Sequence, residues 1–257
     1  MSLECFFQPR SLALVGATDR EGSVGRAVLE NLRTFQGRVF PVNAKHDEVL
    51  GLPAFATLSA LPEVPELVVI VTPAATVPSL VEEAGKLGVK AVVVISAGFK
   101  ETGAEGARIE AEVIEAAKRH STRLIGPNCL GIMNPHAGLN ATFATSMARP
   151  GRVAFLSQSG ALCTAILDWS HEQNVGFSAF VSTGAMADCS MICSTMNTTL
   201  SRRIGAGGTG SGGLPVRQTD RPASPRLHPR RRPVWRRSGS GGFGCSGADV
   251  AARRRCH

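Results

Sequence analysis

The sequence lacks the features that mark several specialised classes of protein. No apolar run approaches the roughly 18–20 residues of a membrane-spanning helix, so we expect no membrane span. The first eleven residues contain Glu4 and no apolar core, which argues against a secretory signal. The seven cysteines are an odd number at irregular spacing, so we expect reduced thiols and a cytoplasmic protein rather than a disulfide framework.

Residues arranged for metal binding or nucleophilic catalysis are also lacking. The six histidines are scattered, and none stands at a metal-site spacing from cysteine or acidic residues. We therefore predict no metal ligand and assign no catalytic residue. Cys129 could act as a nucleophile, but no His, Asp or Lys is placed in the sequence to activate it. A buried thiol is the favoured interpretation.

Positive charge is short in one part of the chain and abundant in the other. Residues 1–188 carry 15 Lys+Arg and 18 Asp+Glu, a net charge of −3. Residues 189–257 carry 13 Arg, no Lys and two Asp, a net charge of +11. The pI near 9.6 would suggest a nucleic-acid partner. The basic excess belongs to the second segment alone, so the two segments are different kinds of sequence.

Residues 1–188 alternate short apolar runs with helical patterns, which is typical of βαβ units and a parallel sheet. We predict strands at 11–16, 38–43, 66–72, 90–96 and 123–126, with helices at 24–34, 76–87 and 104–120. A second unit follows as a strand at 152–157, a helix at 160–172 and a strand at 176–182. The fold class is therefore α/β, with a doubly wound parallel sheet first.

Glycine and polar residues follow the predicted strands, at ends that meet along one crevice of an open α/β sheet. The loop 16–25 has glycines that let the backbone approach a phosphate, and the next helix adds N–H donors. Its spacing departs from GxGxxG, and Lys45 suits a phosphorylated ribose better than a bare diol. The last three predicted strands of this sheet end in similar segments, at 72–73, 96–99 and 126–131. Each alone is a common turn, but together they predict a ligand groove.

A second turn of this kind is Ser157-Gln158-Ser159-Gly160, at another strand-to-helix junction. Two hydroxyls, a glycine and a helix N-terminus suit a phosphate. The alternative is a helix cap without a ligand, since serine is a favoured N-cap residue. The segment does not match G-x-S-x-G, so a hydrolase nucleophile elbow is a poor fit.

Seven segments of the chain resemble the ADP-forming acyl-CoA synthetases of the succinyl-CoA synthetase superfamily. This family includes ADP-forming acetyl-CoA synthetase and the related bacterial protein lysine acetyltransferases. The segments are GATDREGSVG (16–25), PVNAKHDEVLG (41–51), TPAATVP (72–78), VVISAGFKETGAEG (93–106), RLIGPNCLGIMNP (123–135), LNATF (139–143) and GRVAFLSQSGALCTAILDW (151–169). The GPNCLG and SQSGAL blocks in this order are highly specific. The resemblance covers residues 3–188.

The resemblance implies a Rossmann-like CoA-binding domain over residues 1–147 and the start of an incomplete flavodoxin-like ligase domain over 148–188. It implies that CoA contacts Gly16, Thr18, Ser23, Val24, Gly25, Lys45, Thr72, Pro73, Ser96, Ala97 and Asn128. In this assignment the glycine-rich loop holds the CoA phosphates and Lys45 lies near the phosphorylated ribose. Ser157, Ser159 and Gly160 would cradle the phosphate of a phosphohistidine.

The resemblance also implies a reaction and its partners. Such enzymes interconvert acyl-CoA, phosphate and ADP with acid, CoA and ATP, through an acyl phosphate and a phosphohistidine. ATP, ADP and Mg²⁺ would bind an ATP-grasp domain or β subunit. The family's His-bearing loop does not follow Asp188, so we expect the chain to bind CoA and acyl-CoA but to catalyse nothing alone. The alternatives are a stand-alone CoA sensor and the N-terminal part of a lysine acetyltransferase.

The Arg-, Gly- and Pro-rich segment 189–257 is expected to be disordered. We hypothesise that it is a frameshifted translation, because Arg without Lys is typical of GC-rich DNA read out of frame. When the codons for residues 189–196 are read in the alternative frame, they can encode the acidic helix that the family has at this point. That frame can also encode a tyrosine, a residue type that the chain lacks. The alternative is a basic arm on nucleic acid, although no specific nucleic-acid partner is expected.

The second α/β unit presents a packing problem at the level of sequence. One strand–helix–strand unit cannot bury both faces of a sheet. We therefore expect exposed apolar groups, and aggregation or proteolysis, near residues 150–200.

Overall fold

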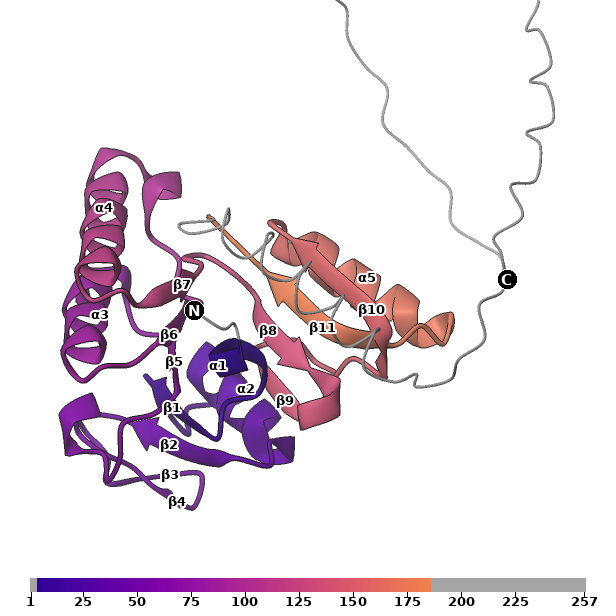
Figure 1. Ribbon diagram of the computed structural model, residues 1–257, viewed down its shortest axis with the longest axis horizontal. Coiled ribbons are helices and arrows are strands. Elements are labelled where there is room, and N and C mark those ends of the chain that lie inside the picture. The colour runs from indigo at the N-terminus through magenta and orange to yellow at the C-terminus, as the bar shows by residue number, and fades with distance from the viewer. Residues whose placement is uncertain (1–3, 186–257) are drawn as a thin grey trace, which may run out of the picture. The chain divides into compact units, whose positions relative to one another are not determined.

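The computed structural model describes residues 4–185 (Figure 1). The chain divides into two units, Met1–Thr209 and Gly210–His257, and every described residue belongs to the first. The predictions made for residues 189–257 lie outside the described residues. Among residues 4–185, no helix is long and apolar enough to cross a membrane.

A five-stranded parallel sheet occupies the first half of the described chain and confirms the predicted doubly wound sheet (Figure 1). Its strands are Ser11–Val15 (β1), Arg38–Val42 (β2), Leu67–Ile70 (β5), Ala91–Val94 (β6) and Arg123–Ile125 (β7). The order is β2-β1-β5-β6-β7, and all neighbours are parallel. The order reverses between β1 and β5, where open α/β sheets leave a crevice at the carboxyl ends of the strands.

Helices cover both faces of this sheet, and the three predicted ones are present. They are Val24–Asn31 (α2), Val77–Lys86 (α3) and Ala104–Arg119 (α4). Because successive side chains of a strand point to opposite faces, β1 contributes to two cores. Leu12 and Leu14 pack in a cluster with residues of α2, whereas Ala13 and Val15 pack with residues of α3 and α4. The buried β-branched strands therefore lie between two helical layers.

Several short elements were not predicted because they are too short to show a periodic pattern. They are the helix Glu4–Phe7 (α1), the strands Glu48–Val49 (β3) and Leu52–Pro53 (β4), and 3₁₀ turns at Leu58–Ala60, Ala74–Thr76, Lys100–Thr102 and Pro135–Ala137. The end of the predicted helix 24–34 is a further 3₁₀ turn, Leu32–Thr34. The four residues of α1 place Phe6 in the core on the α2 side, where it is 1% exposed.

A four-stranded mixed sheet follows, in the order β10-β11-β8-β9. Its elements are Gly131–Asn134 (β8), Leu139–Thr142 (β9), Pro150–Ser157 (β10), Phe177–Ser182 (β11) and the helix Gly160–Glu172 (α5). β10 and β11 are parallel, as predicted for a strand–helix–strand unit. β8 and β9 form an antiparallel hairpin, and β8 pairs with β11.

The hairpin corrects the expectation of a bare sheet face only in part, because the second sheet is covered on both faces at β8 and β11 but not at β10. On one face, Ile132 and Val181 join the core that contains Leu12 and α2. On the other face, Met133 and Phe180 pack with Leu167 of α5. Residues 131–142 supply two strands that the sequence pattern did not reveal. β10 has no buried residue, and Val153, Leu162 and Trp169 are 48%, 49% and 49% exposed, so exposed apolar groups remain in this unit as expected.

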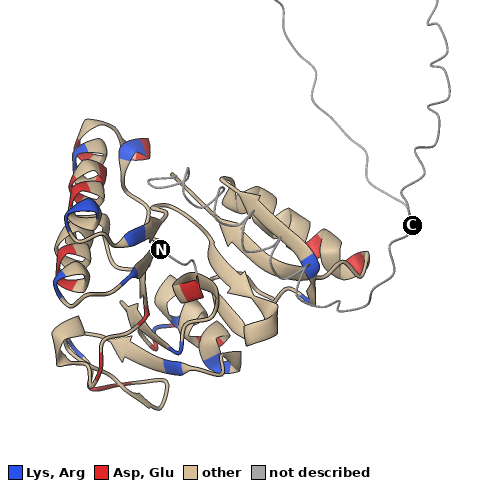
Figure 2. Ribbon diagram, in the orientation of Figure 1, with Lys and Arg blue, Asp and Glu red and all other residues tan. Residues whose placement is uncertain are grey.

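Charged residues are concentrated on α3 and α4 and are few on the second sheet (Figure 2). On α4, Arg108 forms ion pairs with Glu105, at 2.7 Å, and with Glu112. Arg119 at the end of α4 reaches Glu82 of α3 at 2.6 Å. Such exposed pairs contribute little to stability, so the buried apolar clusters account for most of the packing.

Candidate functional site

The glycine-rich loop lies directly after β1, at the carboxyl edge of the first sheet. Gly16 has φ +94°, and its N–H donates to the carbonyl of Val42 at 3.0 Å. A Cβ atom added to Gly25 would stand 2.2 Å from the Gly16 carbonyl oxygen. Only glycine at position 25 therefore allows the first turn of α2 to approach the loop this closely.

Side chains of the loop hold its own backbone. Ser23 is the N-cap of α2, and its Oγ accepts from the N–H of Arg26 at 3.3 Å. The same hydroxyl donates to the Arg20 carbonyl at 2.7 Å, and Thr18 Oγ1 accepts from the Arg20 N–H at 3.2 Å. A helix N-terminus carries a partial positive charge, so this ordered loop suits an anionic group.

The neighbouring strand ends meet along the same edge. A Cβ atom at Gly16 would contact Thr72 Cγ2 at 3.0 Å, which places the ends of β1 and β5 together. Further along, the N–H of Asn128 donates to the Ser96 carbonyl at 2.8 Å, joining the ends of β6 and β7. Strand residues such as Val69 are fully buried, whereas Asn128 is exposed. Polar groups from four strand ends thus line one accessible edge.

Asn43 connects Lys45 to the glycine-rich loop, a role that was not predicted. Its Nδ2 donates to the Ala17 carbonyl at 2.8 Å, while its Oδ1 accepts from the Lys45 N–H at 2.8 Å. The available signal was its position at the end of the second strand. The exposed Lys45 is therefore tied through its backbone to the loop that it was predicted to assist.

Arg26, the first basic residue of α2, is already engaged. Its Nε pairs with Glu30 at 2.8 Å, and its Nη1 donates to the Asp19 carbonyl at 2.8 Å. The hydrogen bond with Glu30 raises the pKa of the Arg26 guanidinium. The side-chain donors of Arg26 are therefore largely committed to the loop and to α2.

A hollow of about 400 Å³ adjoins the start of α2. Ser23 and Val24 line it together with Phe143, which follows β9. Val24 is 40% exposed and Phe143 is 41% exposed, so the hollow has an apolar wall beside the polar loop. Phe143 was not predicted as a site residue.

The second predicted group lies between β10 and α5. Ser159 is the N-cap of α5 and accepts from the Leu162 N–H at 3.2 Å. Ser157 Oγ accepts from the Ser159 N–H at 3.1 Å. An added Cβ at Gly160 would have Leu130 as its nearest neighbour, at 3.8 Å. Ser159 thus performs the capping role weighed as the alternative, and the helix N-terminus remains open to an anion.

A short turn joins the two groups of predicted residues. The N–H of Thr183 donates to the Ser157 carbonyl at 2.8 Å, and that of Ala185 donates to the Pro127 carbonyl at 2.8 Å. Gly184 has φ +56°, and an added Cβ would lie 2.5 Å from the Asn128 carbonyl oxygen. This turn follows β11 and carries no motif, so sequence reasoning missed it.

Cys129 is a buried thiol, as favoured from the sequence. It is 4% exposed, and its Sγ lies 3.3 Å from the Val94 carbonyl oxygen. Burial raises the pKa of the Cys129 thiol to about 12. The thiol therefore stays protonated near neutral pH and is no nucleophile.

Stability at alkaline pH should depend on Cys129. The unfolded thiol titrates near pH 9 and the folded one near 12, so the unfolded state binds fewer protons between these values. We expect the free energy of unfolding to fall from pH 9 towards pH 12, and to fall less steeply in Cys129→Ala. Urea titrations at several pH values measure both slopes, and equal slopes would contradict the assignment.

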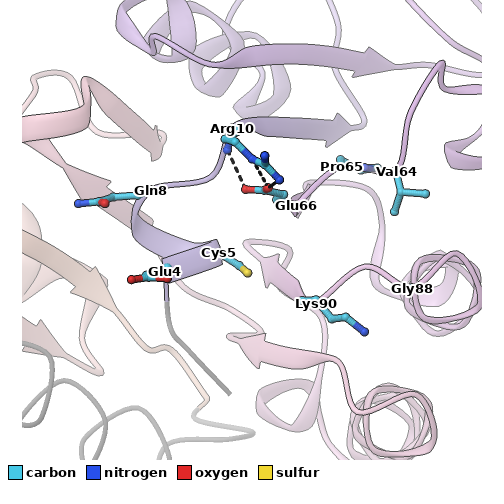
Figure 3. Close-up of a pocket in the computed structure, with 9 residues that line it drawn as sticks. All are labelled: Glu4, Cys5, Gln8, Arg10, Val64, Pro65, Glu66, Gly88 and Lys90. Atoms are coloured by element: carbon cyan, nitrogen blue, oxygen red, sulfur yellow. Dashed lines mark hydrogen bonds and ion pairs between the residues drawn. The ribbon is translucent and has the colours of Figure 1, made fainter.

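A separate hollow of about 450 Å³ lies at the opposite, amino edge of the first sheet (Figure 3). Residues that precede β1, β5 and β6 line it, including Arg10, Glu66 and Lys90. Arg10 Nε donates to Glu66 Oε1 at 2.6 Å. Open α/β sheets bind ligands at the carboxyl edge, so we do not assign the predicted ligand here. Within residues 4–185, no three metal-ligating side chains cluster.

Two domain families match the chain. Residues 10–135 match the CoA binding domain, and residues 150–196 match the succinyl-CoA ligase like flavodoxin domain. The second match extends past Asp188 into residues outside the structural description.

Named relatives align with most of this chain. Acetate–CoA ligase [ADP-forming] I of Archaeoglobus fulgidus is 48% identical over 185 residues, which are 72% of this chain and 27% of the relative. Acetate–CoA ligase [ADP-forming] II subunit alpha of Pyrococcus furiosus is 47% identical over 187 residues, 72% of this chain and 41% of that subunit. The chain therefore spans less than half the length of these relatives.

A solved structure extends the comparison. Acetyl-coenzyme A synthetase 1 of Ca. Korarchaeum cryptofilum, in complex with phosphate and ADP, aligns with a TM-score of 0.69 at 38% identity. The alignment covers 72% of this chain and 40% of that one.

Proposed function

Because this chain belongs to the CoA-binding and succinyl-CoA-ligase-like families of the ADP-forming acetyl-CoA synthetases, we propose that it binds CoA along the carboxyl edge of its first sheet. The observation that carries this proposal is the close approach of Gly25 to the Gly16 carbonyl. That approach brings the N-terminus of α2 against the loop, beside the ends of the neighbouring strands. A phosphate-rich nucleotide needs such a glycine-lined helix start.

In this proposal each part of the edge recognises a different part of CoA. The backbone at Gly16 and Gly25, with the Thr18 and Ser23 side chains, holds the diphosphate. Lys45 faces the phosphate on the ribose. The remaining groove is lined by Val24, Thr72, Pro73, Ser96, Ala97 and Asn128.

We further propose that the chain supplies CoA to an acid–thiol ligase reaction. Acid, CoA and ATP would be converted to acyl-CoA, ADP and phosphate, with an acyl phosphate between the two half-reactions. Ser157, Ser159 and Gly160 would hold the transferred phosphate at the N-terminus of α5, where the helix dipole favours a dianion. The solved relative with phosphate and ADP supports this choice of ligands.

A partner supplies the nucleotide site in this proposal. The Pyrococcus furiosus relative is named as an alpha subunit, which supports a complementary subunit or domain for this chain. An ATP-grasp module would bind ATP, ADP and Mg²⁺ there. Mixing the chain with a candidate partner and measuring ATP-dependent thioester formation tests this step separately from CoA binding.

Lys45 should discriminate CoA from its analogue without the ribose phosphate. We expect Lys45→Met to weaken CoA binding by about tenfold and to leave 3′-dephospho-CoA binding nearly unchanged, because only the former offers the charge that Lys45 would contact. Isothermal titration calorimetry of both ligands measures the ratio. Lys86→Met, on the exposed end of α3, is the matched control and should affect neither ligand. Equal weakening of both ligands by Lys45→Met would refute the assignment.

A further inference from the structure

The turn Thr183–Ala185 contacts the carboxyl edges of both sheets. Through Thr183 it holds Ser157 of the second sheet, with an N–H to carbonyl distance of 2.8 Å. Through Ala185 it holds Pro127 of the first sheet, also at 2.8 Å. Gly184 between them is packed on the Asn128 carbonyl so closely that no side chain fits. The N–H of Asn128 in turn donates a hydrogen bond to the Ser96 carbonyl.

The side chain of Lys100, which lies just before α4, forms a hydrogen bond to this turn. Lys100 Nζ donates to the Ala185 carbonyl at 3.0 Å, across 85 residues of sequence. The same ammonium lies 3.3 Å from Glu110 Oε1, on a carboxylate whose side chain is only 9% exposed. The Lys100 N–H donates to the other oxygen, Oε2, at 3.4 Å. Glu110 therefore orients both the backbone and the ammonium of Lys100.

The short 3₁₀ turn at Lys100–Thr102 is itself anchored. The hydroxyl of Thr102 donates to the Phe99 carbonyl at 2.8 Å, and the Glu101 carboxylate accepts from the Gly98 N–H at 2.8 Å. Phe99 is fully buried. Lys100 thus projects from a turn whose backbone is held by its own hydrogen bonds.

We propose that Lys100 is a positioning residue that holds the turn 183–185 and thereby sets the spacing between the CoA groove and the Ser157–Gly160 loop. Its ammonium satisfies the Ala185 carbonyl, and the two N–H groups of the turn then bind one sheet edge each. The part of this inference that concerns CoA rests on the proposed function. The part that concerns the turn rests on the contacts alone.

Amide hydrogen exchange tests the turn without any ligand. In Lys100→Met, which keeps the aliphatic stem, we expect the Thr183 and Ala185 amides to exchange about tenfold faster. Val93 and other amides of the first sheet should be unchanged. Lys100→Arg retains a donor and should restore slow exchange at the turn. Lys118→Met, an exposed lysine on the last turn of α4, is the matched control. Wild-type exchange in Lys100→Met would overturn the proposal.

Adding CoA separates this inference from the proposed function. In the wild type we expect CoA to slow exchange at 126–128 and also at 157–162. In Lys100→Met the first protection should persist and the second should be lost, because the connecting turn is no longer held. Equal protection of 157–162 in both proteins would overturn the positioning role. Absence of any CoA protection in the wild type would refute the proposed function, while the ligand-free result would still decide the role of Lys100 in the turn.

Discussion

Replacing Gly25 by alanine is expected to weaken CoA binding by at least about tenfold. The new Cβ would stand 2.2 Å from the Gly16 carbonyl oxygen, a distance at which the backbone must move. Displacing α2 from the loop would remove at least one hydrogen bond to a charged phosphate. Such bonds are worth about 1.5–3 kcal/mol, and each 1.4 kcal/mol is a factor of about ten in affinity. Calorimetric titration with CoA measures the loss.

The control for Gly25→Ala must separate a binding effect from a loss of stability. Gly88 has φ +85° and no atom within 4 Å of an added Cβ, and it lies at the amino edge of the first sheet. Gly88→Ala should cost about 1–2 kcal/mol of stability through its left-handed backbone and leave CoA affinity unchanged. Unchanged CoA affinity in Gly25→Ala, or equal weakening in both variants, would rule out the proposed phosphate cradle.

Phe180→Ala should cause the largest loss of stability among single changes in the second sheet. Phe180 is fully buried, its ring stacks on Phe155 at 5.0 Å, and it meets Phe177 edge-on at 5.2 Å. Truncating a buried phenylalanine costs about 3–5 kcal/mol, a large share of the roughly 5–15 kcal/mol that stabilises a typical domain. Urea unfolding followed by circular dichroism measures the change.

Leu162→Ala on α5 is the matched control for Phe180→Ala. Leu162 is 49% exposed, and alanine favours a helix at least as well as leucine. We expect a change within about 0.5 kcal/mol. If Phe180→Ala cost no more than Leu162→Ala, the cluster between the second sheet and α5 would not be a real core.

The regular elements of this protein were predictable because their signals are local. The buried run of β5 and the apolar stripe of α3 each show a periodicity within a dozen residues, and both elements are present near the predicted positions. The hairpin of β8 and β9 was missed, although its residues had been noted for their family resemblance. Its strands have four residues each, and β8 pairs with β11, more than 40 residues along the chain, so no local pattern reveals them.

The residues of the candidate site also fall into a predictable group and an unpredictable group. Glycine at strand ends, such as Gly16 and Gly25, marks it in the sequence, because tight turns and close backbone approach demand that residue type. The roles of Asn43 and Lys100 were not predictable. Each acts through a contact with a distant backbone carbonyl, on Ala17 and Ala185 respectively.

The α/β class and the order of the regular elements were readable from the residues alone, and the motif blocks identified the family. These follow from periodicity and residue type, which short-range sterics and hydrophobicity impose on any chain of this pattern. The tertiary structure was needed to show that residues 131–142 complete the second sheet, and it confirmed the burial of Cys129 that the sequence favoured. It alone revealed that the turn 183–185 joins the two edges. These three features depend on contacts between segments that are distant in the sequence. Burial and long-range hydrogen bonds form only when the folded chain brings those segments together.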